Sequence, residues 1–261
     1  MTDTHARGAV QRVCVTGGRR GIGRAIAYAF AEKGAAIVIN DVVDDEATGE
    51  TMEGIAERGG KARFLKSDIG DLAAQESLVR DAFAAFGGLD VLVNNAGISV
   101  AQRGDMLDAT PASFDRLIKV NLRGPFFLTQ AVARRWLAEP ATAPRSIINL
   151  ASANSEFASI DRAEYCISKT GVAMMTKLYA IRLAQAGIGV FELRPGVIRT
   201  DMTAVVKERY DRLIEGGLTP IKRWGEPSDL GPVAVALASG DFHFCTGQVM
   251  HVDGGLQIPR L

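Results

Sequence analysis

Short apolar runs alternate with helix-length amphipathic stretches along most of the chain, and this alternation limits the possible folds more than any other feature. The runs cover Arg12 to Thr16, Ala35 to Asn40, Ala62 to Lys66, Val91 to Asn94, Ser146 to Leu150, Gly189 to Leu193 and Gln248 to Val252. Strands that alternate with helices predict a parallel sheet, here of seven strands. Parallel connections are right-handed crossovers, so helices should cover both faces, and a ligand should bind at the carboxyl ends of the strands.

The chain shows no sign of a division into separate units. Its 261 residues contain no internal repeat, no low-complexity segment and no long linker, so we expect one domain over residues 1–261. The stretch from about Thr200 to Trp224 breaks the alternation and predicts a helical insertion over the sheet edge. Such an insertion can serve as a substrate lid or be a plain surface excursion.

Charge and hydropathy exclude two classes of partner. Lysine plus arginine equal aspartate plus glutamate at 30 each, which leaves no basic excess to attract nucleic acid. The first twelve residues are polar, and no stretch approaches the roughly 20 apolar residues of a membrane span, so we expect no membrane partner and a cytoplasmic location.

The cysteines and histidines show no pattern typical of a disulfide framework or a metal site. Cys14, Cys166 and Cys245 are widely spaced and include no CxxC pair, which predicts reduced and mostly buried thiols. The three histidines, His5, His243 and His251, lack ligand spacing, so we expect no metal.

A glycine-rich turn follows the first predicted strand. It reads Thr16-Gly17-Gly18-Arg19-Arg20-Gly21-Ile22-Gly23 and leads into an amphipathic helix. Glycines permit a tight turn and a close backbone approach to a pyrophosphate, and the amide groups of the helix start attract its charge. The sequence therefore predicts a dinucleotide site at this turn, against the alternative of a turn that binds nothing.

Asp41 ends the second predicted strand, about 20 residues after the glycine turn. An acid at this distance can accept hydrogen bonds from the adenosine ribose and repels a 2′-phosphate, which favours NAD over NADP. Arg19 and Arg20 would stabilise a phosphate and favour NADP instead. A third interpretation makes Asp41 a helix or turn cap, because DVVDDEATGE also resembles a helix start.

The motifs together resemble those of the short-chain dehydrogenase/reductase family over nearly the whole chain. The resemblance rests on Thr-Gly-x-x-x-Gly-x-Gly, on Asn94-Asn95-Ala96-Gly97, on Tyr165-x-x-x-Lys169 with Ser152 placed 13 residues before the tyrosine, and on Asn121 in VNLRGPF. Pro195-Gly196 with Thr200, and the closing GQVMHVDGG, continue the match. The resemblance implies a single Rossmann-type, doubly wound α/β domain, transfer of a hydride between NAD(P) and a CH–OH or carbonyl carbon, and a homotetramer.

The resemblance also implies a role for each matching residue. The catalytic set would be Ser152, Tyr165, Lys169 and Asn121. Asp68 would contact the adenine ring, Asn94 would hold the fourth strand, and Ile198 and Thr200 would meet the carboxamide. The full cofactor set would be Gly17, Arg19, Arg20, Gly21, Ile22, Gly23, Asp41, Asp68, Ile69, Asn95, Ala96, Gly97, Tyr165, Lys169, Pro195, Gly196, Ile198 and Thr200.

The catalytic residue types suit the chemistry. A free tyrosine has a pKa of about 10, but Tyr165 and Lys169 lie at i and i+4 on one helix face, where the ammonium group favours the phenolate. Ser152 can hold the substrate oxygen beside the phenol. Taken singly, these residues also fit a solvated helix face, a strand terminator and, for Asn121, a buried structural amide. Lys169 is expected from the family to bind the nicotinamide ribose and to relay the proton outward with Asn121 and water.

Substrate contacts should come from residues 100–103, residues 154–157 and the insertion after Thr200. Asn154, Ser155 and Glu156 are polar and favour a sugar or polyol. Arg103, Lys207 and Arg209 could bind a carboxylate, phosphate or sulfonate, although charged loop residues are usually just solvated.

Other function classes are left open by the sequence. The runner-up is an NADPH-dependent 3-oxoacyl reductase, which has closely similar motifs. A non-catalytic dinucleotide-binding sensor would keep the fold without the chemistry, and a metal-dependent alcohol dehydrogenase would need metal-ligand spacing that the histidines lack.

Overall fold

The seven predicted strands are all present in the computed structural model, which describes residues 11–260. Their bounds differ little from the predicted ones, and the largest difference is at the end of β6, which runs on to Pro195. The strands are β1 (Arg12–Thr16), β2 (Ala36–Asp41), β3 (Lys61–Lys66), β4 (Val91–Asn94), β5 (Arg145–Leu150), β6 (Ile188–Pro195) and β7 (Val249–Val252).

The strands form one sheet in the order β3-β2-β1-β4-β5-β6-β7, and every neighbouring pair is parallel. Strands β4, β5 and β6 are buried along their whole length, because helices cover both faces and leave no polar side. The predicted parallel, doubly wound sheet is confirmed. The strand order reverses between β1 and β4, so the crevice for a ligand opens at the carboxyl ends of these two strands.

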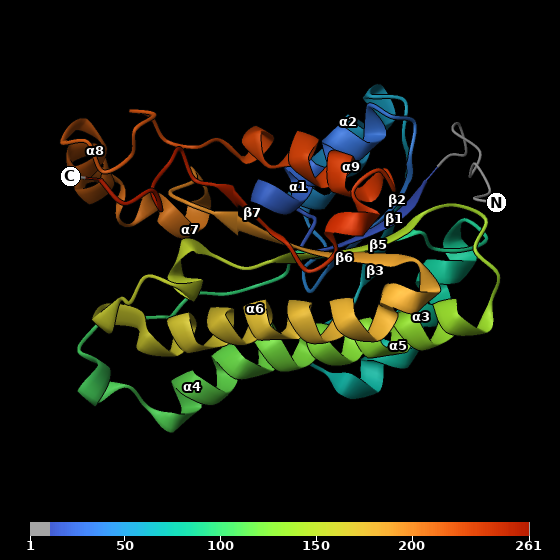
Figure 1. The fold of residues 1–261 in the computed structure, drawn as a ribbon, viewed down its shortest axis with the longest axis horizontal. Coiled ribbons are helices and arrows are strands. Elements are labelled where there is room, and N and C mark those ends of the chain that lie inside the picture. The colour runs from blue at the N-terminus through green and yellow to red at the C-terminus, as the bar shows by residue number, and fades with distance from the viewer. Residues whose placement is uncertain (1–10, 261) are drawn as a thin grey trace.

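Helices lie in a layer on each side of the sheet (Figure 1). One apolar core joins α1, α2 and α9 to one face, and a second joins α3, α5 and α6 to the other. The α-helices are α1 (Gly21–Ala31), α2 (Glu46–Glu57), α3 (Leu72–Ala85), α4 (Pro111–Ile118), α5 (Gly124–Ala138), α6 (Ala163–Leu183), α7 (Asp201–Ala204), α8 (Lys207–Glu215) and α9 (Gly231–Ala238).

A π-helical turn over Lys119–Arg123 joins α4 to α5 in one continuous rod. Asn121 lies in this turn and is buried. Its Oδ1 accepts a hydrogen bond from the N–H of Ile98 at 2.8 Å, and its Nδ2 donates to the carbonyl of Ile98 at 2.9 Å. The wide turn therefore fastens the helix to the segment that follows β4.

The segment after β6 forms two short helices, α7 and α8, which lie beyond the carboxyl end of the sheet (Figure 1). Trp224 closes the segment and is buried, and its Nε1 donates to Asp211 of α8 at 2.7 Å. Ile198 and Gly225 form a parallel bridge at the base. The stretch predicted to be a helical insertion therefore returns to the sheet where it left.

The cysteines agree only in part with the sequence prediction. All three are free; Cys14 is buried, and its burial raises the pKa of the thiol to about 12. Cys166 is partly exposed, but Cys245 is exposed, so the prediction of a buried thiol is wrong there, because the short turn of residues 243–245 lies outside both cores. Within residues 11–260, no helix is long and apolar enough to cross a membrane.

Candidate functional site

A cavity of about 1230 Å³ opens at the carboxyl ends of the strands, where the strand order reverses. Most of the predicted site residues line this one cavity, although they come from segments far apart in the sequence. From the cofactor set, the lining includes Gly17, Arg19, Arg20, Gly21, Ile22, Asp41, Asp68, Ile69, Asn95, Ala96, Gly97, Tyr165, Lys169, Pro195, Gly196, Ile198 and Thr200. Ser152, Asn154 and Arg103 line it too, whereas Gly23, Asn121 and Glu156 do not.

The glycine turn has the backbone that its sequence predicts. Gly17 and Gly21 have φ angles of +62° and +57°, in the left-handed region that favours glycine. A Cβ on Gly23 would lie 2.3 Å from the carbonyl oxygen of Gly17, so Gly23 permits α1 to pack against the turn. Gly23 thus shapes the turn from behind and does not line the cavity.

The start of α1 fits an anionic group. Its first turn contains no acidic residue, and Arg20 at the cap position makes no side-chain hydrogen bond to the helix. The amide groups of this turn therefore remain available for an anion, and the helix dipole favours negative charge there. Gly17, Gly21 and Ile22 line the adjoining cavity wall, so the residues present fit the pyrophosphate of a dinucleotide.

Hydrogen bonds between Thr16 and Asn95 join the ends of β1 and β4 beneath this wall. The Thr16 hydroxyl oxygen accepts from the N–H groups of Asn95 and Ala96, both at 3.1 Å. The Asn95 side-chain amide donates to the carbonyls of Thr16 and Gly17, both at 2.9 Å. Asn94 points the other way and donates to Thr129 of α5 and Asn149 of β5, each at 2.8 Å.

Two carboxylates hold Arg19, one of the arginines that could favour a 2′-phosphate. Its Nη1 donates to Asp45 at 2.6 Å, and its Nε lies 3.7 Å from Asp41. Asp45 also caps α2 and forms a capping box with Thr48, so Asp41 is not the cap of that helix. Asp41 does cap the turn that follows β2, because its Oδ1 accepts from the N–H groups of Val42 at 2.8 Å and Val43 at 3.3 Å, and it also lines the cavity.

The second arginine of the turn is also paired. Arg20 donates to Asp201 at the start of α7 at 2.8 Å, and both side chains are more than half exposed. Both arginines of the glycine turn therefore have a carboxylate partner. An exposed pair of this kind is weak, so the main structural obstacle to a 2′-phosphate is the pair of acids around Arg19.

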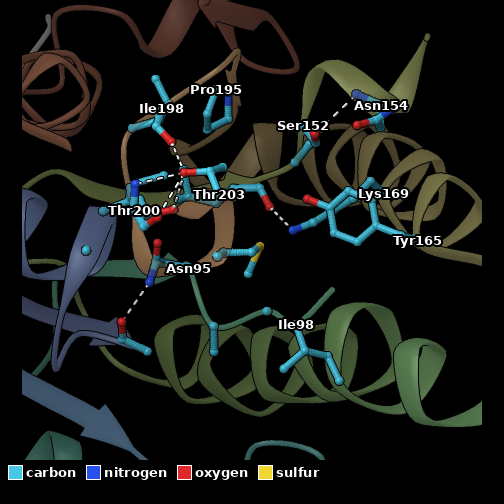
Figure 2. A pocket seen from close by; sticks show the side chains of 18 of the residues that line it. Asn95, Ile98, Ser152, Asn154, Tyr165, Lys169, Pro195, Ile198, Thr200 and Thr203 are labelled. Carbon is cyan, nitrogen blue, oxygen red and sulfur yellow. Dashed lines mark hydrogen bonds between the residues drawn. The ribbon is translucent and has the colours of Figure 1, made fainter. Parts of the chain in front are cut away.

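Ser152, Tyr165 and Lys169 converge on the opposite side of the cavity (Figure 2). Ser152 follows β5, and the other two come from the first turns of α6. The Lys169 ammonium nitrogen lies 5.9 Å from the centre of the Tyr165 ring and donates to the carbonyl of Leu150 at 2.7 Å. The i and i+4 spacing thus brings the two side chains together, as the sequence predicts.

Burial dominates the ionisation of both groups. Desolvation raises the pKa of Tyr165, and the hydrogen bond with Ser152 and the charge of Arg162 oppose this shift only in part. Desolvation also lowers the pKa of Lys169 to about 8, while the charge of Glu192 opposes that shift. The sequence argument considered only the attraction between ammonium and phenolate, and it omitted the larger effect of burial.

Asn121 stands behind the lining. Besides its two bonds to Ile98, its Nδ2 donates to the hydroxyl of Ser168 at 3.0 Å. A Cβ on Gly97 would lie 3.4 Å from both the Asn121 Oδ1 and the Lys169 Nζ, so the glycine leaves room for both groups.

The predicted substrate residues divide into two groups. Arg103, Asn154 and Arg209 line the cavity, whereas Glu156 and Lys207 do not. Glu156 pairs with the buried Arg194, which also binds Glu192. Lys207 pairs with Asp211 on its own helix at 2.6 Å. The structure therefore gives no support to a substrate contact by Glu156 or Lys207.

Sequence reasoning missed three contributors to the site. The first is Asp45. The spacing Asp45-x-x-Thr48 indicates only a helix cap, and it does not show that Asp45 also forms a salt bridge with Arg19. Arg162 lines the cavity, and its spacing of three residues before Tyr165 was a usable signal. The third contributor is an apolar wall, for which no motif exists; it consists of Phe157, Val206, Leu213, Leu218 and Leu256.

No group of histidine, cysteine and acidic side chains that could hold a metal ion occurs in residues 11–260. His5 lies outside the described residues.

Comparisons with known proteins point to one family. A family model described as enoyl-(acyl carrier protein) reductase matches residues 17–257. A subunit, BbsD, of a hydroxy(phenyl)methylsuccinyl-CoA dehydrogenase from Thauera aromatica is 37% identical over 241 residues, which cover 92% of this chain and 94% of the relative.

Solved structures resemble the whole fold. A 3-oxoacyl-(acyl-carrier protein) reductase from Brucella melitensis in complex with NAD is 50% identical, with a TM-score of 0.93 over 97% of this chain and 100% of the other. A gluconate 5-dehydrogenase from Burkholderia cenocepacia in complex with NADP and tartrate is 35% identical, with a TM-score of 0.86 over 96% of each chain.

Replacing Gly23 by alanine should weaken both the fold and the cofactor site. The new Cβ would meet the Gly17 carbonyl oxygen at 2.3 Å, so we expect a loss of about 1–3 kcal/mol in the free energy of unfolding and weaker NADH binding. Urea unfolding and NADH fluorescence titration measure the two effects. Gly49→Ala is the control, because its Cβ meets nothing within 4 Å in α2, and it should be neutral or stabilising. Equal behaviour of the two variants would contradict the packing role of Gly23.

Burial of Lys169 should give stability a defined pH dependence. The pKa is about 8 in the folded state and about 10.4 in the unfolded state. The folded protein therefore loses the proton first, and wild-type stability should rise by about 3 kcal/mol between pH 8 and 10.5, relative to Lys169→Met. Urea unfolding of both proteins across this range measures the change in the difference. Lys177→Met removes an exposed lysine of the same helix, and its free energy of unfolding should differ from that of wild type by the same amount at every pH. A pH-independent difference for Lys169→Met as well would show that the pKa of Lys169 is not lowered in the folded state.

Proposed function

Because the chain belongs to the short-chain dehydrogenase/reductase family, we propose that it is an NAD-dependent enzyme that interconverts a hydroxyl and a carbonyl on a small substrate, with Tyr165 as acid/base. Relatives in this family are dehydrogenases and reductases that act on CH–OH or carbonyl groups, and the family binds NAD(P). The observation that carries the proposal is the convergence of Ser152, Tyr165 and Lys169 on the cavity that the glycine turn also lines.

In this proposal the nicotinamide, when bound, would supply the hydride acceptor for oxidation of the substrate carbon and the hydride donor for its reduction. Pro195, Gly196, Ile198 and Thr200 would hold the nicotinamide end, and Asp41, Asp68 and Ile69 would hold the adenosine end. During oxidation, Tyr165 takes the hydroxyl proton as the carbon–oxygen double bond forms. During reduction, the phenol gives the proton back to the oxygen.

The positions of the other catalytic residues support this proton transfer. Burial raises the pKa of the Tyr165 phenol, and a hydrogen bond with Ser152 opposes part of that rise, so the two side chains are neighbours and a substrate oxygen held by the serine would also reach the tyrosine. Lys169 and Asn121 lie behind them and would pass the proton outward with water, an arrangement that rests on the family resemblance. The raised pKa of Tyr165 keeps the phenol protonated at neutral pH, which suits reduction, whereas oxidation should accelerate as the pH rises.

The preference for NAD follows from the carboxylates around Arg19. Asp41 and Asp45 both approach its guanidinium, so the arginine brings no net positive charge to the adenosine end. A 2′-phosphate placed there would meet two carboxylates. NADP remains the alternative, and one similar structure holds NAD while another holds NADP.

The substrate is either a small polar molecule, such as a sugar or polyol, or a 3-oxoacyl compound. Polar residues after Ser152 favoured the first, but Asn154 donates to the carbonyl of Phe157, and Glu156 faces Arg194. The apolar wall favours the second, because an acyl chain could pack against Leu213, Leu218 and Leu256. Similar proteins carry names of both kinds, so they do not choose between the two.

We further propose that the protein is a cytoplasmic homotetramer made of one domain, with the segment of α7 and α8 as a substrate lid. Exposed apolar side chains on α5 and α6 support self-association, among them Phe127, Met174, Leu178 and Ile181.

Replacing Tyr165 by phenylalanine should leave NADH affinity nearly unchanged and lower turnover by about 10²- to 10⁴-fold, because the acid/base is lost while the ring remains. Steady-state rates with a panel of alcohols and ketones measure the effect. Tyr179→Phe is the control, because Tyr179 lies on the same helix outside the cavity lining and its hydroxyl donates to the carbonyl of Phe126 at 2.8 Å. A Tyr165→Phe enzyme with most of its rate would remove this residue from the acid/base role.

Replacing Asp41 by alanine should improve NADPH binding relative to NADH by about tenfold, because one carboxylate near the 2′-position is lost. Asp45→Asn keeps a side chain that can cap α2 but frees Arg19 of its closest charge, so it should shift the ratio in the same direction. Fluorescence titrations with both cofactors measure the ratio. Asp44→Ala, which removes an exposed acid outside the cavity lining, should leave it unchanged. No shift in the Asp41 variant would mean that this acid does not select the cofactor.

A further inference from the structure

Arg162 lies beside Tyr165 in the cavity lining and forms no salt bridge with a carboxylate of the described residues. It immediately precedes α6, and its guanidinium carbon lies 5.3 Å from the centre of the Tyr165 ring. Its Nε is buried and has no hydrogen-bond partner. A buried guanidinium N–H that donates to nothing costs free energy, unless a ligand supplies the acceptor.

The charges around Arg162 leave an excess of positive charge at this end of the cavity. Arg103 donates to Asp161 at 2.9 Å, and Arg209 approaches the same carboxylate oxygen at 3.7 Å. Burial opposes the ionisation of Asp161, but hydrogen bonds from Ser159 and Arg103, together with the charges of Arg103 and Arg162, lower the pKa of its carboxyl group and keep it ionised. Arg103, Arg162 and Arg209 therefore have Asp161 as their one shared carboxylate, which leaves this group with an excess of positive charge.

The apolar wall strengthens the attraction between these arginines and a bound anion. Phe157, Val206 and Leu213 line the cavity together with Arg103, Arg162 and Arg209. A bound substrate that covers this wall excludes water, and the attraction between an arginine and an anion is stronger where water is excluded. Arginine also binds a carboxylate through two parallel hydrogen bonds, which fixes the orientation of the carboxylate.

We propose that Arg162 binds a carboxylate of the substrate, so that the enzyme acts on short hydroxy acids and the corresponding oxo acids. This inference rests on the proposed function, because it assigns the substrate class of the same site. The guanidinium and the phenol are close neighbours, so the carboxylate and the reacting carbon must be separated by only a few carbon atoms. Arg103 and Arg209, which both pair with Asp161, add positive charge to the same cavity lining.

A free acid should bind this site more tightly than a neutral thioester, because its carboxylate balances the charge of the arginines. A thioester carbonyl can accept one hydrogen bond from Arg162, but it brings no charge to balance the arginines. The site would then keep its excess positive charge when the substrate binds. Hydroxylated acids fit both the arginines and the catalytic residues, whereas an uncharged polyol fits only the latter.

The test compares each acid with its own uncharged amide. Wild type and Arg162→Met are assayed for NAD-dependent oxidation of short α-, β- and γ-hydroxy acids and of their carboxamides, at constant ionic strength. We expect wild type to prefer the acid over the amide by about 10- to 100-fold in kcat/KM, and this ratio to fall towards one in Arg162→Met. Arg162→Lys keeps the charge without the planar fork and should restore part of the ratio. Arg182→Met removes an exposed arginine near the other end of α6 and should leave the ratio as in wild type.

A binding experiment separates this inference from the proposed function. Malonate and malonamide are compared as ligands of the NADH-loaded protein by isothermal titration, with wild type and with Arg162→Met. Tighter binding of malonate that depends on Arg162 would support the anion site even if no alcohol were oxidised. The anion site would be overturned if wild type preferred neither the acids over their amides nor malonate over malonamide. If both proteins then oxidised neutral alcohols or reduced thioesters at equal rates, the proposed oxidoreductase function would still stand. NADH affinity of each variant reports whether it has folded.

Discussion

The hydrogen bonds between Thr16 and Asn95 are the constraint on which the site depends. They lie where the strand order reverses, so the two strands that they join lead into connections on opposite faces of the sheet. One side-chain amide fixes the first carbonyls of the glycine turn, and one hydroxyl fixes the backbone after β4. The start of α1 and the segment from Gly97 onward are thereby held at opposite walls of one crevice. Binding groups and catalytic groups can then meet there without a large movement of the backbone.

Much of this arrangement could be predicted from the sequence, because it depends on local patterns. Apolar runs located the strands to within a residue or two, and the spacing of Tyr165 and Lys169 placed them on one helix face. What failed was the choice of partners for charged side chains. Glu156 faces Arg194 from another strand, and Arg19 faces Asp45 from the next helix. Such pairs depend on how segments far apart in sequence pack together, and no spacing along a single chain encodes them.

The site keeps charged groups where burial disfavours them. Lys169 is buried with a lowered pKa, Tyr165 is buried with a raised pKa, and the Nε of Arg162 has no acceptor. The buried ammonium group of Lys169 and the unpaired Nε of Arg162 cost stability in the absence of ligands, and both groups become useful when a ligand supplies a partner. The two extensive apolar cores on the faces of the sheet make that cost tolerable.

The π-helical turn over Lys119–Arg123 has a further consequence for the rod formed by α4 and α5. One extra residue in a turn changes the angular phase of all following side chains by roughly 100°. The apolar stripe of α5, with Leu128, Val132 and Trp136 on the sheet, therefore does not continue in phase into α4. Arg116 and Lys119 lie on the cavity side instead. Deleting a single residue from this turn would rotate one half of the rod against the other, so its length is as much a part of the site as any side chain.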